Sequence, residues 1–271
     1  DTLAGSVAGV SAEARRALTE HMGFTYLTQV QKATLPDIIA GKDVVAKAKT
    51  GTGKTVAFLL PTLDRLAARA RAKQVAPNRR EIAVLVLSPT RELASQIERE
   101  AVALLKFQPP GAVFVECMFG GTPLERDIRR FTDARPIDVL VMTPGRLEDH
   151  MKNAPEVGQR LSRGVRVLIF DEADRLLDMG FRHVIERIVK QLPTDRQTLL
   201  FSATLPPALN SMLGTATTAP LVRPGYVVID TIGEEEDAER AVVSVPQDGI
   251  VVPMDRQIVA LDNIIRDHVA S

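Results

Sequence analysis

The sequence predicts an α/β fold in which a mostly parallel β-sheet is covered by helices on both faces. Short runs of apolar and β-branched residues alternate with longer segments of helical spacing, and most of the short runs are apolar on both faces. Strands buried on both faces of a parallel sheet have this character. Strand–helix–strand alternation implies right-handed crossovers and an open sheet. The expected strands are 43–46, 82–87, 113–118, 138–142, 165–170, 198–201 and 226–229.

The segments between these strands repeat apolar residues every three or four positions, as amphipathic helices do. The clearest example follows the second strand, where Leu93, Ile97, Ala101 and Leu104 have this spacing. We therefore expect helices in these segments.

Composition is that of an ordinary globular chain. The 271 residues are 45% hydrophobic and 25% charged, with 34 Lys and Arg against 34 Asp and Glu, so bulk charge gives no argument for nucleic acid. The absence of Trp argues against an aromatic base-stacking platform. No apolar run reaches the ~18 residues of a membrane span, so no membrane partner is expected. The single cysteine, Cys117, excludes an internal disulfide and fits an intracellular reducing compartment.

The chain changes character near residue 230. An acidic cluster over 234–239 lacks apolar periodicity, which indicates a solvated linker near 231–240. After it, 242–252 is expected to form a strand, and Ile258, Leu261, Ile264, Ile265 and Val269 mark an amphipathic helix. One strand and one helix bury too little to form a core. We therefore predict a domain over 1–240 and a truncated second domain over 241–271, in a chain that begins with Asp1 like a fragment.

A phosphate-binding loop follows the first predicted strand. Its spacing matches the general pattern, except that Ala48 stands where that pattern has Gly. Glycines let backbone N–H groups turn inward around a phosphate, and the helix N-terminus adds partial positive charge. Lys54 would reach the β- and γ-phosphates, and the Thr55 hydroxyl would ligate Mg²⁺. The predicted nucleotide-binding residues are Ala48, Lys49, Thr50, Gly51, Thr52, Gly53, Lys54 and Thr55.

Two carboxylates follow the fifth predicted strand. Asp171 would hold Mg²⁺ largely through water, and Glu172 would orient and deprotonate an attacking water. An acidic helix start or a glycosidase carboxylate pair would give similar residues, but neither accounts for the phosphate loop. Lys54, Asp171 and Glu172 are therefore the expected catalytic residues for phosphoryl transfer.

The ordered motifs resemble those of the DEAD-box RNA helicases. The resemblance runs from about residue 23 to 229, and Leu27 stands where the family usually has Pro. It implies a RecA-like P-loop NTPase domain that uses ATP and Mg²⁺. The matching segments are Gly23-Phe24 with Thr28-Gln29-Val30-Gln31, 89–94, Gly120-Gly121, 143–146, 171–174 and 202–204.

The resemblance also implies roles for individual residues. Gln31 would contact the adenine edge and Phe24 would line its pocket, and an amide that donates and accepts favours ATP over GTP. Hydroxyls of Ser202 and Thr204 would bond Asp174 and couple the nucleotide to RNA. The residues expected to hold the RNA backbone, independently of sequence, are Pro89, Thr90, Arg91, Gly120, Gly121, Thr143, Gly145 and Arg146. Each of these loops alone would also fit an ordinary strand-to-helix turn.

The implied function is that of an ATP-dependent RNA helicase or RNA chaperone that unwinds short duplexes. A second RecA-like domain of the same protein would supply arginines to the ATP site, so this piece alone is expected to be a poor helicase. A non-helicase RNA clamp and a DNA-directed helicase remain alternatives; discrimination by the 2′-OH separates RNA from DNA. The sequence does not distinguish cytoplasm, nucleus and organelle.

Several residues have a simpler structural role. The four histidines, His21, His150, His183 and His268, lack metal-ligand spacing and are expected at the surface or at helix ends. Cys117 is expected to be an inert core thiol. Phe181 lies where the resemblance places an RNA-bending wedge, with core packing as the alternative. For the basic run over 65–80, a solvated helix end is favoured over an auxiliary RNA contact.

Overall fold

The computed structural model describes residues 9–72, 81–121, 123–132, 136–214, 220–232, 252–253 and 256–270. The chain divides into two compact units, Asp1–Gly233 and Glu234–Ser271. The acidic cluster and residues 242–251 of the last predicted strand lie outside the described residues.

The predicted parallel sheet is confirmed. Within the described residues the sheet has seven strands in the order β3-β4-β2-β5-β6-β1-β7, and every neighbouring pair is parallel. The strands are β1 (Val44–Lys47), β2 (Val84–Leu87), β3 (Val115–Met118), β4 (Val139–Met142), β5 (Val167–Phe170), β6 (Gln197–Ser202) and β7 (Val227–Asp230).

Most strands begin one or two residues later than the apolar runs predicted. At β5 the cause is the preceding helix, because Val165 caps it and donates its N–H to the Leu161 carbonyl at 3.1 Å. Val165 is fully buried all the same. An apolar run therefore marks buried residues. Strand pairing begins only after the last residue whose N–H is bonded to the preceding helix.

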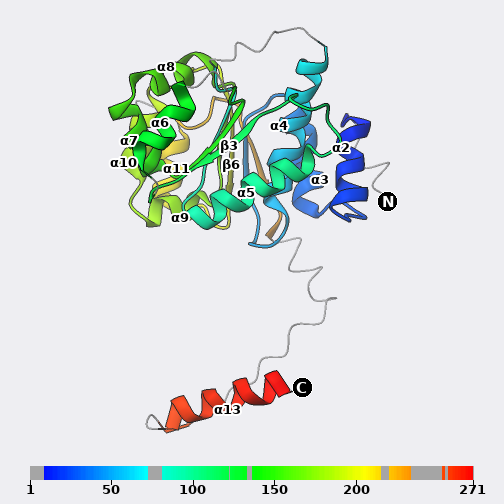
Figure 1. Ribbon diagram of the computed structural model, residues 1–271, viewed down its shortest axis with the longest axis vertical. Coiled ribbons are helices and arrows are strands. Elements are labelled where there is room, and N and C mark those ends of the chain that lie inside the picture. Colours follow the sequence, from blue (N-terminus) through cyan, green and yellow to red (C-terminus); the bar gives the residue numbers. More distant parts are fainter. Residues whose placement is uncertain are drawn as a thin grey trace. The chain divides into compact units, whose positions relative to one another are not determined.

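Helices cover both faces of the sheet. The described helices are α2 (Ala12–Arg16), the π-helix η1 (Ala17–His21), α3 (Gln29–Ile39), α4 (Lys54–Arg71), α5 (Arg91–Leu104), α6 (Leu124–Thr132), α7 (Pro144–Asn153), α8 (Pro155–Gly164), α9 (Ala173–Asp178), α10 (Arg182–Val189), α11 (Pro207–Leu213) and α13 (Gln257–Ala270). Helices α3, α4 and α5 pack on one face, and α6 to α11 pack on the other (Figure 1). Among the described helices, none is both long and apolar enough to cross a membrane.

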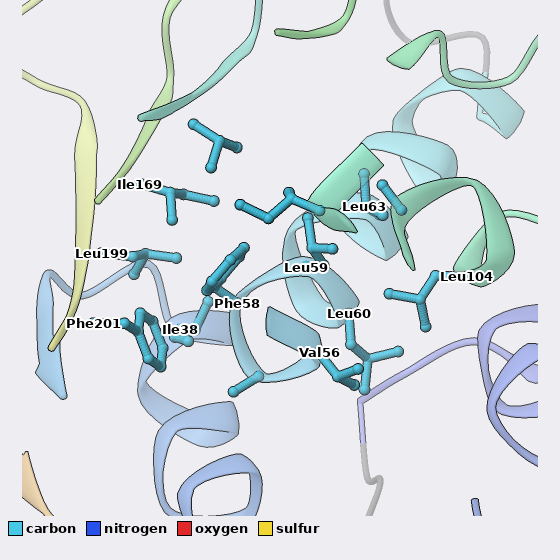
Figure 2. Close-up of a cluster of buried hydrophobic side chains, with 14 of the residues drawn as sticks. Ile38, Val56, Phe58, Leu59, Leu60, Leu63, Leu104, Ile169, Leu199 and Phe201 are labelled. Atoms are coloured by element: carbon cyan, nitrogen blue, oxygen red, sulfur yellow. The ribbon is translucent and has the colours of Figure 1, made fainter. Parts of the chain in front are cut away.

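Each face of the sheet has its own core, because successive residues of a strand point to opposite faces. In β1, Val44 and Ala46 pack on the side of α3 to α5, whereas Val45 packs on the other side. Figure 2 shows the first of these cores, with Phe58 of α4 beside Phe201 of β6. Their ring centroids lie 5.3 Å apart in an edge-on arrangement. This contact fixes α4 against the centre of the sheet.

The second unit contains α13 at the position of the predicted amphipathic helix. Its apolar side chains Ile258, Val259, Leu261 and Ile264 are exposed. Our division of the chain into a domain over 1–240 and a truncated domain over 241–271 remains a prediction.

Phe58→Ala is expected to lower the free energy of unfolding by about 3–5 kcal/mol, since it leaves a cavity between α4 and the sheet. Thermal or denaturant unfolding measures this. Val102→Ala on α5 is the control, because its side chain is 57% exposed and its removal should change stability by only about 0.5 kcal/mol. Equal losses in both variants would contradict the assignment of Phe58 to the core.

Candidate nucleotide and RNA site

The predicted phosphate-binding loop connects β1 to α4 at the carboxyl edge of the sheet. Gly53 precedes α4 with a φ of +85°, a left-handed conformation that favours glycine. The ammonium of Lys54 donates to the Ala48 carbonyl at 2.9 Å, across the loop, and its side chain is only 7% exposed. Positive charge and the N-terminus of α4 therefore meet in one loop, which is the arrangement that favours a phosphate.

Gln31 holds the loop from behind. Its Nε2 donates to the Gly53 carbonyl at 3.0 Å, and its Oε1 accepts the Thr28 N–H at 3.0 Å. A Cβ at position 53 would lie 2.5 Å from that Nε2, so glycine is required there for space as well as for φ. Gln31 is buried and does not line the cavity described next. Its contact with adenine remains a prediction, for which an amide retains one N–H and one lone pair.

A cavity of about 720 Å³ opens beside the loop. It brings together residues that are far apart in the sequence, from the segment before α3, the loop, α5 and the end of β5. The predicted site residues that line it are Phe24, Thr50, Gly51, Gly53, Lys54, Thr55, Asp171 and Glu172. Its volume lies in the range of small-molecule sites. Of the other predicted loop residues, Ala48 is buried, and Lys49 accepts the Thr52 hydroxyl through its carbonyl at 2.9 Å.

One wall of the cavity was missed by the sequence analysis. It is formed by Leu93, Gln96, Glu100 and Ala103 of α5. These positions recur at helical spacing, one residue before the buried stripe of α5 that packs on the sheet. The sequence did contain a signal for this wall: the polar residues Gln96 and Glu100 lie at the margin of the apolar stripe of α5. Nothing in the sequence showed that this margin faces the phosphate loop.

Asp171 and Glu172 occupy unusual environments at the end of β5. Burial and the negative charge of Glu172 raise the pKa of Asp171 to about 7, and Lys54 opposes that shift. Glu172 has a φ of +48° and pairs with Arg175 at 2.7 Å. It is the only non-glycine residue with positive φ among the described residues. Such strained backbone often occurs at functional sites.

The donor groups fit Mg²⁺. A carboxylate and a hydroxyl, from Asp171 and Thr55, line the same cavity, and hard oxygen ligands suit this ion. A bound divalent cation would favour the ionised form of the buried Asp171. Among the described residues, no cluster of three or more His, Cys, Asp or Glu could hold a metal by itself. Mg²⁺ in nucleotide sites usually takes one or two carboxylates and completes its shell with phosphate and water.

The predicted hydrogen bonds between Asp174 and the loop after β6 are present. Thr204 donates to Asp174 Oδ2 from its N–H at 2.9 Å and its hydroxyl at 2.8 Å, and Ser202 Oγ accepts the Asp174 N–H at 3.1 Å. Burial raises the pKa of Asp174, but these hydrogen bonds outweigh burial and bring it below its ordinary value. The Ser202 carbonyl also accepts the Ala48 N–H at 3.0 Å. The end of β6 therefore connects the phosphate loop to Asp174, whereas a coupling role remains a prediction.

The three loops expected to hold RNA end neighbouring strands. They follow β2, β3 and β4, which are adjacent in the sheet. Arg91 is exposed and lies against Gly121, where a Cβ would be 2.5 Å from its Nη1. Pro89 is buried, and the Thr90 hydroxyl caps α5 by accepting the Leu93 N–H at 3.3 Å. The structure thus brings the first two loops together at one edge.

The third loop presents its backbone rather than its arginine. Thr143 and Gly145 are half-buried at the start of α7, and a Cβ at Gly145 would lie 3.6 Å from the Phe181 ring. Phe181 packs against the core on the side of α6 to α11, which agrees with the alternative of core packing.

In the second loop, Gly120 also lies beside Arg91, with a Cβ position 3.6 Å from its Nη2.

Arg146 is not placed as we expected. Its guanidinium is buried and donates to Asp127 Oδ2 of α6 from Nε at 3.0 Å and from Nη2 at 2.7 Å. His150 Nε2 lies 3.2 Å from the same oxygen. Helical periodicity assigns Arg and His to solvent, but here α6 supplies a carboxylate inside the protein. Direct phosphate contact by this side chain is therefore not supported.

His150 lies at a helix end, one of the two positions that we expected, but it is not at the surface. The side chain is fully buried in the last turn of α7, with its ring 5.4 Å from that of Phe131. Burial lowers the pKa of His150 and outweighs the hydrogen bond to Asp127, which favours the neutral ring. The prediction for Cys117 is confirmed: it is buried, and burial together with Glu98 and Glu116 raises its pKa to about 12.

Comparisons with known proteins agree with this geometry. The DEAD/DEAH box helicase family model matches residues 28–212. DEAD-box ATP-dependent RNA helicase 25 of Oryza sativa subsp. japonica is 46% identical over 92% of this chain and 40% of its own length. DEAD-box ATP-dependent RNA helicase 26 of Arabidopsis thaliana is 44% identical over 92% of this chain and 28% of its own. The chain therefore spans less than half the length of these relatives.

Solved structures show the same arrangement. The DEAD-box helicase Mss116 bound to ssRNA and UDP-BeF matches 86% of this chain and 46% of its own, with a TM-score of 0.71 and 30% identity. A hypothetical ATP-dependent RNA helicase from Sulfolobus tokodaii matches 80% of this chain and 56% of its own, with a TM-score of 0.64 and 32% identity.

Gly53→Ala is expected to destabilise the protein more than Gly51→Ala. Both glycines have positive φ, which costs an L-residue about 1–2 kcal/mol, but only Gly53 would place a Cβ against Gln31. At Gly51 a Cβ meets nothing within 4 Å. Unfolding curves of the two variants measure the difference. Equal stabilities would show that Gln31 does not pack against the loop.

Arg146→Met is expected to lower the free energy of unfolding by about 3–5 kcal/mol, because it leaves the carboxylate of Asp127 buried without its cationic partner. Denaturant unfolding measures this loss. Arg163→Met on α8 is the control, since Arg163 is exposed and its replacement should cost about 0.5 kcal/mol or less. A stable Arg146→Met protein that has lost RNA affinity would instead favour direct contact with RNA.

Proposed function

The chain belongs to the DEAD/DEAH box helicase family, and from this membership we propose that it is the ATP-binding domain of an ATP-dependent RNA helicase. Its relatives carry that name, and it spans less than half of their length. The observation that carries the proposal is the shared cavity of the phosphate loop and the carboxylates after β5. It supports ATP hydrolysis as the chemistry of this edge of the sheet.

Each residue of the cavity has a task in that chemistry. Lys54 would transfer its hydrogen bond from the Ala48 carbonyl to a phosphate oxygen and stabilise the charge that develops on the transferred group. Glu172 would orient the attacking water and accept its proton. Thr55 and Asp171 would hold Mg²⁺, which when bound neutralises charge on the phosphates. The products would be ADP and inorganic phosphate.

Adenine would lie toward the segment before α3. Phe24 lines the cavity there and offers an apolar surface for the base. Gln31 lies behind the loop. Its side-chain amide retains one N–H and one lone pair for hydrogen bonds to the adenine edge, which favours ATP over GTP.

RNA would bind along the ends of β2, β3 and β4. Exposed Arg91 would supply charge, and backbone amides and hydroxyls at Gly120, Gly121, Thr143 and Gly145 would contact phosphates without sequence preference. The similar helicase Mss116, which is described as bound to ssRNA, supports RNA as the ligand. Arg146 would act through its ion pair with Asp127, by fixing the start of α7.

The remaining parts of the proposal concern the whole protein. A second RecA-like domain in cis would complete the ATP site, and Asp174 with Ser202 and Thr204 would couple nucleotide to RNA. The full protein would then unwind short duplexes locally. The single cysteine supports an intracellular reducing compartment.

ATP turnover by this chain, with and without single-stranded RNA, tests the proposal alongside binding of labelled nucleotide. We expect nucleotide binding with little turnover, because the second domain is needed to complete the site. Failure to bind nucleotide would refute the proposal. Strong RNA-stimulated turnover would show that this chain already holds a complete site. Equal stimulation by DNA and RNA of the same sequence would favour a DNA-directed enzyme.

Lys54→Ala is expected to weaken nucleotide binding by about 10- to 100-fold, the contribution of one charge-assisted hydrogen bond. Labelled ADP measures the affinity, and a thermal melt checks the fold. Lys152→Ala is the control, because Lys152 is 62% exposed on α7 and does not line the cavity. A Lys54→Ala protein that binds ADP normally would remove the loop from the nucleotide site.

A further inference from the structure

A second cavity lies at the opposite edge of the sheet. It has a volume of about 200 Å³ and is lined by residues at the amino ends of β2, β5 and β6. Because the strands are parallel, this edge faces away from the phosphate loop and the three loops assigned to RNA. Four arginines line it: Arg65, Arg69, Arg166 and Arg223.

The arginines come from separate segments. Arg65 and Arg69 lie one turn apart on α4, Arg166 directly precedes β5, and Arg223 precedes β7. The first two belong to the basic run for which we favoured a solvated helix end. Arg69 is exposed, as that interpretation expects, and Arg65 is half-buried. Both also line a concavity, while residues 73–80 of the run lie outside the described residues.

Positive charge in this cavity is only partly compensated. Arg223 donates to Asp43, with Nη2 at 2.6 Å from Oδ1, and Asp195 is the one carboxylate among the lining residues. Arg65 donates at 2.7 Å to the amide oxygen of Gln197, a neutral partner. Within the described part of the chain, the guanidinium groups of Arg69 and Arg166 make no hydrogen bond or ion pair, and Arg166 is bonded only through its backbone, to Ala83 and Gln197.

The pKa of Arg65 reflects the positive charges that lie close together in this cavity. Burial of its guanidinium and the positive charge of nearby Arg69 bring the pKa of Arg65 below its ordinary value. Arginine nevertheless stays protonated in proteins, so the cavity keeps its excess positive charge. An anion entering it would relieve this repulsion.

We propose that this cavity binds phosphate groups of the RNA backbone, at a point beyond the strand held by the carboxyl-edge loops. The inference rests on the proposed RNA-binding function. The cavity is smaller than the ~300 Å³ at which small-molecule sites begin, so it accommodates a phosphate group of a longer chain rather than a whole nucleotide. Guanidinium groups match phosphate oxygens in pairs, and such contacts carry no sequence information.

The test uses two double variants with the same change in net charge. Arg69→Gln/Arg166→Gln removes the two cavity guanidinium groups that have no partner among the described residues, and both side chains are exposed, so the fold should persist. Arg99→Gln/Arg163→Gln is the matched control, because these arginines are exposed and do not line the cavity. Affinity is measured over a range of salt concentrations for a short single-stranded RNA that fills only the carboxyl-edge loops and for a strand several times longer.

We expect the cavity variant to lose affinity for the long strand alone. Each phosphate contact on a single strand contributes about 0.7 to the slope of log K against log salt, so the loss of two should reduce that slope by about 1.4. The control should keep the wild-type slope with both strands. Equal losses in both variants, equal losses with both strands, or no loss would overturn the proposal.

Two further measurements identify the ligand and separate this inference from the proposed function. Because the phosphate loop would also bind pyrophosphate, the first measurement is made in a Lys54→Ala background. If inorganic pyrophosphate raises the melting temperature of that protein more than that of the same protein with the cavity substitutions, while RNA binding is unchanged, the cavity takes small phosphates and RNA is the wrong source. If the wild-type protein binds neither strand, the proposed RNA function fails, and the inference about RNA phosphates fails with it. Normal short-strand binding with an unchanged long-strand slope refutes the inference alone.

Discussion

The site depends above all on the parallel alignment of β5, β6 and β1. Parallel strands bring their carboxyl ends to one edge of the sheet, where ligands of open α/β folds bind. The loop after β1 and the carboxylates after β5 therefore meet, although more than a hundred residues separate Lys54 from Asp171. The same constraint groups the loops after β2, β3 and β4. Both faces of these strands are buried under helices, as is typical of parallel sheets.

Buried polar contacts fix the positions of the loops at this edge relative to one another. Ser202 is the junction, because its carbonyl accepts the Ala48 N–H and its hydroxyl accepts the Asp174 N–H. On the other face, Asp127 joins α6 to α7 by accepting from Arg146. A buried charge is costly unless it is paired, so these contacts fix relative positions rather than add much net stability. They restrict the movement of loops that would contact phosphates.

Charge is distributed differently at the two edges of the sheet. At the carboxyl edge, Lys54 lies near Asp171, whose pKa is raised to about 7 by burial and by the charge of Glu172. At the amino edge, arginines outnumber the single carboxylate that lines the cavity with them. A net charge of zero over the whole chain therefore conceals a local excess of positive charge. Binding of a polyanion follows such local fields rather than the sum.

The sequence by itself determined the strands, the helix of the second unit and the phosphate loop, because these depend on local periodicity and on glycines at fixed spacing. It also predicted that Thr204 would bond Asp174, through a motif resemblance. Tertiary structure alone decided which face of α5 lines the cavity and that Arg146 and His150 are buried against Asp127. The physical reason is that side-chain burial depends on partners from distant segments. Periodicity assigns an Arg or a His to solvent, and only a carboxylate brought close by another helix makes the interior favourable for it.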